Sequence, residues 1–205
     1  CNRLLRAHYR EAGLPSTFQI LDTADQLSSI KRLMKLMNVD DERYAPKQVQ
    51  GYINSCKEEG LRANQVDAYD GHSQKLREIY EEYDKQCNRE GVADFAELLL
   101  RCYELLSRDE RIRAHYQSRF QYILVDEFQD TNRLQYQWLK LLAGTSNCMF
   151  AVGDDDQSIY GFRGARVGNM HDFERDFKVQ KVVKLEENYR SVSYTHLTLP
   201  TNREV

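Results

Sequence analysis

Apolar residues recur with the spacing of amphipathic helices from Thr23 to about Ser107. We predict four helices in this stretch. Their inward faces are marked by Leu27, Ile30, Met34 and Met37, then Val49, Tyr52, Ile53 and Cys56, then Leu76, Ile79, Tyr80 and Tyr83, then Phe95, Leu98, Leu99, Cys102 and Leu106. Thr23 is the expected N-cap of the first helix, with the Gln26 side chain reaching back to it, while Gly60 and Gly91 are expected stop signals. Because no segment of the block alternates as a strand does, we expect it to be all-helical.

The pattern changes after Phe120 to short apolar runs at Tyr122–Val125, Met149–Val152 and Lys181–Leu185. Two helical stretches separate these runs, marked by Leu134, Trp138, Leu141 and Leu142, and by Met170, Phe173 and Phe177. This order predicts a βαβαβ unit with parallel strands buried on both faces. Ligands of such sheets bind at the carboxyl ends of the strands, so those ends are the places to look for chemistry.

Composition excludes some classes of protein. The 205 residues are 41% hydrophobic and 30% charged, which is enough apolar material for one or two domains with real cores. The formal net charge is −3, so any binding to nucleic acid must come from a local site. No apolar run approaches the roughly 20 residues that span a bilayer, so we expect no membrane association.

The five cysteines are scattered, without a CxxC pair or a His/Cys cluster at metal-ligand spacing. Neither a zinc site nor a disulfide framework is therefore predicted, and a reducing, cytoplasmic setting fits best.

Two carboxylates, Asp126 and Glu127, follow the first predicted strand directly. Mg²⁺ prefers oxygen ligands and keeps several waters, so Asp126 could hold the ion while it binds nucleotide phosphates on its other side. Glu127 could then orient and deprotonate an attacking water. The alternative is a strand followed by an ordinary acidic turn.

The second strand leads into a run of acidic residues that ends at Gln157. An amide can donate to a γ-phosphate oxygen and lose that partner after hydrolysis, so Gln157 is suited to sensing the nucleotide state. Tyr160 and Phe162 follow beside Arg163, which is the composition of a base-stacking platform. Taken alone, both rings are better explained as core residues.

Beyond the third strand lies Arg190, whose guanidinium could neutralise charge on a transferring phosphate. A single arginine in a loop is more often solvated or paired with a carboxylate.

Three segments together resemble helicase motifs II, III and IV of the UvrD/Rep/PcrA family of superfamily 1 DNA helicases, in the family's order. They are Val125–Asn132, Val152–Ala165 and Leu185–Ser191. Stretches upstream are also similar to members of the family, at Phe18–Asp22, Tyr52–Ser55 and Asp94–Leu100.

The resemblance implies an α/β fold: part of a RecA-like parallel sheet with flanking helices (subdomain 1A) and an all-helical inserted subdomain (1B). The expected divisions are 1–21 for the first part of 1A, 22–118 for 1B, 119–193 for the rest of 1A, and 194–205 for a tail foreign to the native fold.

The resemblance also implies a motor that couples ATP hydrolysis to 3′-to-5′ movement on single-stranded DNA, with Mg²⁺ as cofactor. Repair or replication would be its setting, and single-stranded DNA and its junctions with duplex its partners. The implied roles are Mg²⁺ binding for Asp126, catalysis for Glu127, γ-phosphate contact for Gln157 and Arg190, and DNA contact for Tyr160, Phe162 and Arg163.

Several departures from the family pattern matter. Phe162 stands where Trp is usual, so that stacking contact covers less base area. No GxxxxGK[ST] sequence occurs, so we expect that this chain, which starts at Cys1 and reads as part of a longer protein, does not hydrolyse ATP alone. The alternatives are a subunit of a RecB/AddA-type helicase-nuclease, and a DNA-binding relative that does not hydrolyse nucleotide.

Overall fold

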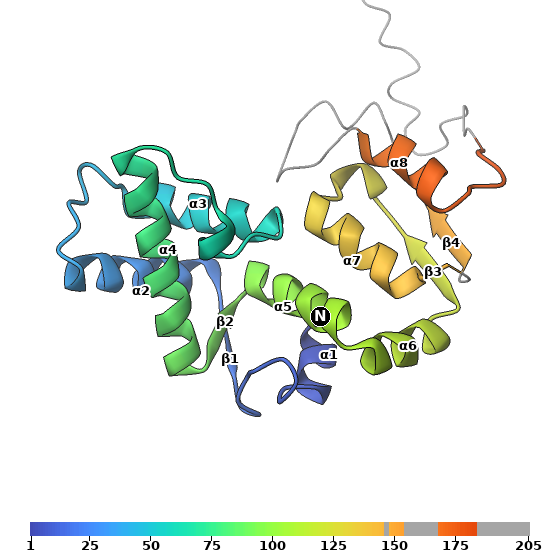
Figure 1. Cartoon of the computed structure of the whole chain (residues 1–205), viewed down its shortest axis with the longest axis horizontal. Coiled ribbons are helices and arrows are strands. Elements are labelled where there is room, and N and C mark those ends of the chain that lie inside the picture. Colours follow the sequence, from blue (N-terminus) through green and yellow to red (C-terminus); the bar gives the residue numbers. More distant parts are fainter. Residues whose placement is uncertain (146–147, 154–167, 184–205) are drawn as a thin grey trace, which may run out of the picture.

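The computed structural model describes residues 1–145, 148–153 and 168–183, arranged as two lobes (Figure 1). A helical lobe consists of α2 (Thr23–Leu36), α3 (Pro46–Glu58) and α4 (Gly71–Glu90). The remaining elements are α1 (Asn2–Ala7), β1 (Gln19–Leu21), η1 (Ala63–Gln65), β2 (Val92–Asp94), α5 (Phe95–Arg108), α6 (Glu110–Arg119), β3 (Tyr122–Val125), η2 (Phe128–Asp130), α7 (Arg133–Ala143), β4 (Cys148–Ala151) and α8 (Gly168–Asp176).

The helical lobe is built around one apolar cluster to which all three of its helices contribute. Its fully buried side chains include Ile30, Val49, Ile53, Ile79, Tyr80 and Tyr83. The predicted apolar faces are therefore confirmed for these helices. The predicted helix end at Gly91 is confirmed as well, since Gly91 follows α4 in the left-handed conformation (φ 68°) that glycine adopts without strain.

The start of α2 differs from the prediction. Asp22, not Thr23, is the N-cap, because its Oδ1 accepts hydrogen bonds from the backbone N–H groups of Ala24 and Asp25, both at 2.8 Å. Gln26 does not reach back to the cap. Its side chain is buried and its Nε2 donates to Asn54 Oδ1 at 2.8 Å.

A short parallel pair joins the two lobes: β1 runs beside β2, with Gln19 opposite Val92 and Leu21 opposite Asp94. The expectation that the block from Thr23 to Ser107 holds no strand is therefore wrong. A strand of three residues is too short to show alternation, and its partner lies far away in the sequence.

The second lobe has its own apolar cluster, shared by α1, α5, α6 and α7. Cys102, Leu105 and Leu106 are fully buried there, whereas Phe95, which we predicted to face inward, is 60% exposed. Phe95 is the first residue of α5, so its side chain lies at the end of the helix, outside the packed region.

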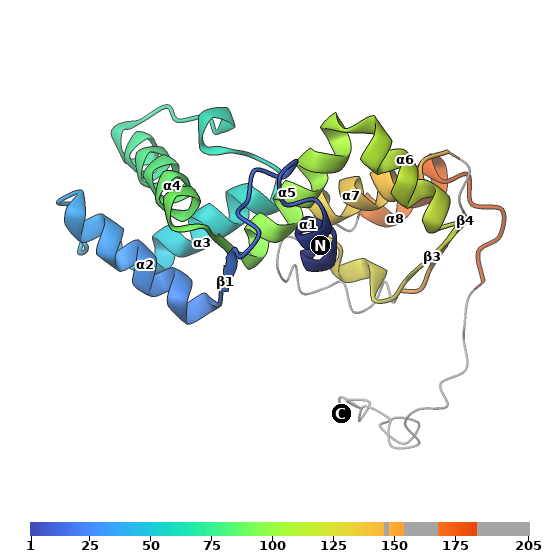
Figure 2. The ribbon, with the colours of Figure 1, turned by 90° about the horizontal axis from the view of Figure 1, so that it is seen from below.

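Strands β3 and β4 pair in parallel, with Tyr122 opposite Cys148 and Val125 opposite Ala151. In Figure 2, α7 and α8 lie on one side of this pair. The side chains on the other side are exposed, at 74% for Tyr122 and 76% for Leu124, so the prediction that both faces are buried is wrong for this chain.

The third predicted strand begins at Lys181, and its described part, residues 181–183, forms no strand. The proposed tail, residues 194–205, lies outside the described residues. All five cysteines are free. In the described ranges, no helix combines the length and apolar character needed to cross a bilayer.

Candidate active site

The ends of strands β3 and β4 are tied together beyond the sheet. The backbone N–H of Val152 donates to Val125 O at 2.8 Å, and the N–H of Phe128 donates to Val152 O at 2.9 Å. These bonds fix the turn that carries Asp126 and Glu127 against the end of β4, at the edge where parallel sheets bind their ligands.

Asp126 is the first residue after β3, and its side chain is exposed. Its Oδ1 accepts a hydrogen bond from the Glu127 backbone N–H at 3.0 Å, which orients the carboxylate. Among the residues that the structure describes, no three carboxylate, histidine or cysteine side chains are arranged so that they could hold a metal ion by themselves. A single exposed carboxylate fits Mg²⁺, which commonly takes one or two protein carboxylates and fills its shell with water and phosphate oxygens.

Glu127 has an unusual backbone conformation, left-handed at φ 50° and ψ 45°. A residue other than glycine rarely adopts this region, and such strain collects at functional sites. The turn is held by η2, in which the Asp130 N–H donates to Glu127 O at 2.9 Å. The Glu127 side chain is exposed, and its Oε2 accepts a hydrogen bond from Gln129 Nε2 at 2.7 Å.

The inner side of this turn packs against apolar side chains. Phe128 is 1% exposed and packs against Phe173 of α8, with 4.9 Å between the ring centres, and against Tyr136 of α7 at 6.3 Å. Asn132 then caps α7 by accepting from the Gln135 N–H at 2.8 Å. The turn that carries the two carboxylates is thus held by well-packed apolar side chains.

The structure brings together two of the predicted site residues, Asp126 and Glu127. The other five, Gln157, Tyr160, Phe162, Arg163 and Arg190, lie outside the described residues. Gln129 was missed by the sequence analysis. Its position two residues after the proposed base, in the same turn, is the signal that could have identified it.

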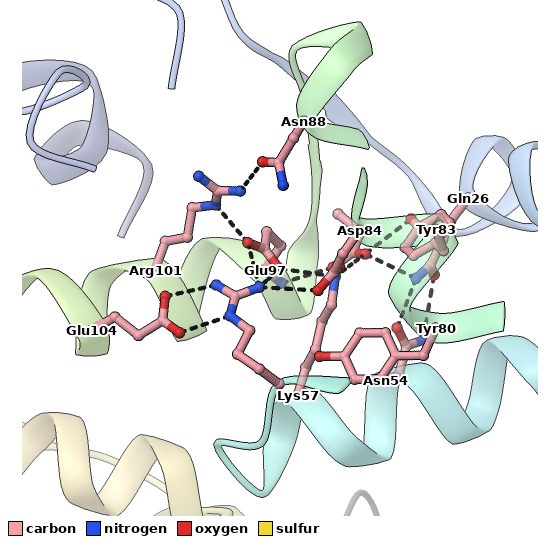
Figure 3. Close-up of polar contacts among 12 residues, drawn as sticks. Gln26, Asn54, Lys57, Tyr80, Tyr83, Asp84, Asn88, Glu97, Arg101 and Glu104 are labelled. Carbon is pink, nitrogen blue, oxygen red and sulfur yellow. Dashed lines mark hydrogen bonds and ion pairs between the residues drawn. The ribbon is translucent and has the colours of Figure 1, made fainter. Parts of the chain in front are cut away.

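A second polar cluster, also missed, lies where the helical lobe meets β2 and α5 (Figure 3). Its centre is Lys57, whose side chain is fully buried. The Lys57 Nζ lies 2.9 Å from Asp94 Oδ2, 2.9 Å from Glu97 Oε2 and 3.2 Å from Asp84 Oδ1. Arg62 adds ion pairs to Glu97 at 2.9 Å and Glu104 at 2.7 Å.

The charges of this cluster support one another. Burial alone would lower the pKa of Lys57, but Glu97, Asp94 and Asp84 outweigh it and raise that pKa well above its ordinary value. Burial likewise opposes ionisation of Glu97, but Lys57, Arg62 and Arg101 hold the pKa of its carboxyl well below the usual range. Lys57 and Glu97 therefore stay charged and paired, whereas burial raises the pKa of the Asp84 carboxyl. The cluster connects α3, α4, β2 and α5, which is the behaviour of a structural joint.

Comparison with known proteins identifies the class. Residues 1–178 match the family described as the UvrD/REP helicase N-terminal domain, so the chain belongs to this family, and the resemblance seen in the motifs is confirmed.

Named relatives agree with this assignment. The chain is 52% identical over 193 residues to DNA helicase II of Haemophilus influenzae, an alignment that covers 94% of the chain and 26% of the relative. Identity to DNA helicase II of Escherichia coli is 51%, covering 94% and 27%. Identity to the ATP-dependent DNA helicase PcrA of Staphylococcus epidermidis is 41%, covering 93% and 26%. The chain thus spans about a quarter of the length of these relatives.

Proposed function

We propose that this chain is part of an ATP-dependent DNA helicase that moves 3′-to-5′ along single-stranded DNA and acts in repair or replication. The observation that carries the proposal is the pair of carboxylates at the carboxyl end of β3, held against the end of β4 in a chain of the UvrD/REP family. The names of the relatives, DNA helicase II and ATP-dependent DNA helicase PcrA, support the same activity.

In this proposal Asp126 holds Mg²⁺ at the sheet edge. The bound ion would neutralise charge on the nucleotide phosphates. Glu127 orients the attacking water and accepts its proton, the positioning and acid–base role that phosphoryl transfer asks of a protein. The exposure of both side chains and the fixed turn between them support these roles.

The remaining roles rest on the motifs in the sequence. Gln157 and Arg190 are proposed to contact the γ-phosphate, and Tyr160, Phe162 and Arg163 to contact single-stranded DNA. Junctions of single-stranded and duplex DNA are the proposed substrate.

We further propose that the helical lobe is the inserted subdomain 1B and that the second lobe is part of 1A. The sequence predicted the second boundary of the insertion at residue 118. The shared apolar cluster of α1, α5, α6 and α7 supports a boundary near β2, since α5 and α6 pack with the second lobe.

Two alternatives have less support. The relatives named above are helicases, which favours a helicase over a RecB/AddA-type helicase-nuclease. A relative that binds DNA without hydrolysis would have no use for a strained turn that presents Glu127. Because the sequence has no GxxxxGK[ST] cradle, hydrolysis is proposed for a longer protein that contains this chain.

A graft tests the proposal. This chain would replace the matching segment of E. coli DNA helicase II, and we would measure ATP hydrolysis stimulated by single-stranded DNA and the unwinding of a duplex with a 3′ tail. We expect both activities, no unwinding of a duplex with a 5′ tail, and loss of hydrolysis in the same graft carrying Asp126→Asn. A graft that melts at the temperature of the E. coli enzyme yet hydrolyses no ATP would contradict the proposal.

A further inference from the structure

Gln129 is a buried side chain that touches the proposed base. It is 8% exposed, and its Nε2 donates to Glu127 Oε2 at 2.7 Å. An exposed glutamate has several rotamers of similar energy, and a hydrogen bond from a fixed donor to its charged carboxylate favours one of them. The backbone of Gln129 is held in place because Gln129 belongs to η2, in which Phe128 is buried in the apolar cluster with Tyr136 and Phe173, and this backbone sets where the amide donor lies.

Gly153, at the end of β4, lies directly against this amide. A Cβ at residue 153 would lie 2.9 Å from Gln129 Oε1, 3.3 Å from the Gln129 backbone N and 3.4 Å from Phe128 Cβ. One backbone hydrogen bond joins Phe128 to Val152 and another joins Val152 to Val125, so the backbone on both sides resists movement. The atom that can yield is Oε1, the end of a flexible side chain, so a methyl group at 153 would turn the Gln129 amide away from its present place.

We propose that Gln129 is a positioning residue that holds the carboxylate of Glu127 toward the attacking water, and that Gly153 keeps the space this amide needs. The end of β4 thereby sets the orientation of the base on β3 through one side chain. This inference rests on the proposed function, because it assigns Glu127 the role of the base.

The test uses the grafted full-length enzyme described above with three variants: Gln129→Met, Gly153→Ala and the double variant. Methionine keeps the length of the side chain and removes the donor. Each variant is measured for kcat and KM of DNA-stimulated ATP hydrolysis, equilibrium binding of a fluorescent ATP analogue, and melting temperature. Gln121→Met, an exposed glutamine just before β3, is the matched control.

We expect Gln129→Met and Gly153→Ala each to lower kcat by about 10- to 100-fold, since a displacement of about 1 Å can cost roughly 10²-fold. KM and nucleotide affinity should change by less than about 3-fold, because positioning acts on the water and leaves ATP contacts intact. Since both changes act through one amide, the double variant should be no slower than Gln129→Met alone, within about 2-fold.

Three results would overturn the inference: kcat near that of the Gln121→Met control in Gln129→Met, a change confined to KM, or effects of the two substitutions that multiply. If Gly153→Ala fails to fold, Gln129→Met decides alone. Glu127→Gln distinguishes a failure of this inference from a failure of the proposed function. If Glu127→Gln loses turnover while Gln129→Met keeps normal turnover, only this inference is wrong. If Glu127→Gln keeps normal turnover, the proposed function is wrong.

Discussion

Lys57 offers a sharp test of the joint between the lobes. Replacing it by methionine keeps most of the apolar stem and removes the charge at the centre of the cluster. Asp94 and Asp84 then lose their nearest cation, and Glu97 loses one of its three. The side chains are only 2% exposed for Asp94, 3% for Glu97 and 17% for Asp84.

Breaking a buried ion pair by removing one partner costs about 3–5 kcal/mol, because the charge left behind stays out of water. Arg62 remains 2.9 Å from Glu97 and 3.4 Å from Asp84 and compensates part of the loss, whereas Asp94 keeps the Tyr83 hydroxyl at 3.0 Å as a neutral donor. We therefore expect Lys57→Met to lower the free energy of unfolding by about 3 kcal/mol, the low end of that range.

Urea unfolding of this chain at pH 7, followed by far-ultraviolet circular dichroism, measures the loss. Lys85→Met is the matched control, because Lys85 is 51% exposed and pairs with Glu81 and Glu82 on the surface of α4. Exposed pairs contribute about 0.3–0.5 kcal/mol, so the control should hardly change. The penalty of Lys57→Met should also shrink at lower pH, as the stranded carboxylates take up protons. A loss below about 1 kcal/mol, or a penalty independent of pH, would refute the role given to Lys57.

Two further predictions concern Asp176 of α8 and the residues proposed to contact single-stranded DNA. Hydrogen bonds from Lys140 and Tyr136 lower the pKa of Asp176 to about 2 from its ordinary 3.8, so its contribution to stability is present above 3.8 and is lost as the pH falls through about 2. The difference in unfolding free energy between the protein and Asp176→Asn should shrink from pH 6 to pH 3; a constant difference would contradict this. In the grafted enzyme, Phe162→Ala should weaken binding to labelled oligothymidine about 5- to 150-fold, measured by fluorescence anisotropy, while Phe162→Trp should not. Unchanged affinity in Phe162→Ala and Tyr160→Ala would assign both rings to the core.

Periodicity predicted the elements that are long enough to repeat. The faces of α2, α3 and α4 and both strands of the β3–β4 pair were found from spacing alone. It failed at β2, where three residues carry no repeat, and at Leu124, whose burial depends on what covers the sheet and not on the strand's own sequence.

The residues of the candidate site were likewise predicted only where their pattern is local in the sequence. Asp126 and Glu127 were predicted because a strand end followed by carboxylates is a local pattern. Lys57 was not, since its partners come from α4, β2 and α5, and each charged residue alone resembles a solvated one. Gln129 lies two residues after Glu127, which is a local signal, but the contact with Gly153 that supports its proposed role exists only because β3 pairs with β4.

The role of Glu127 is tested most directly by the turnover of Glu127→Gln in the grafted enzyme, measured together with its affinity for ATP. The amide is nearly isosteric with the carboxylate but cannot accept the proton of the attacking water. We predict that kcat falls by about 10²- to 10⁴-fold while ATP affinity stays within a few fold of the unmodified graft. Hydrolysis near the unmodified rate would contradict the assignment of Glu127 as the base, and with it the active site proposed at the end of β3.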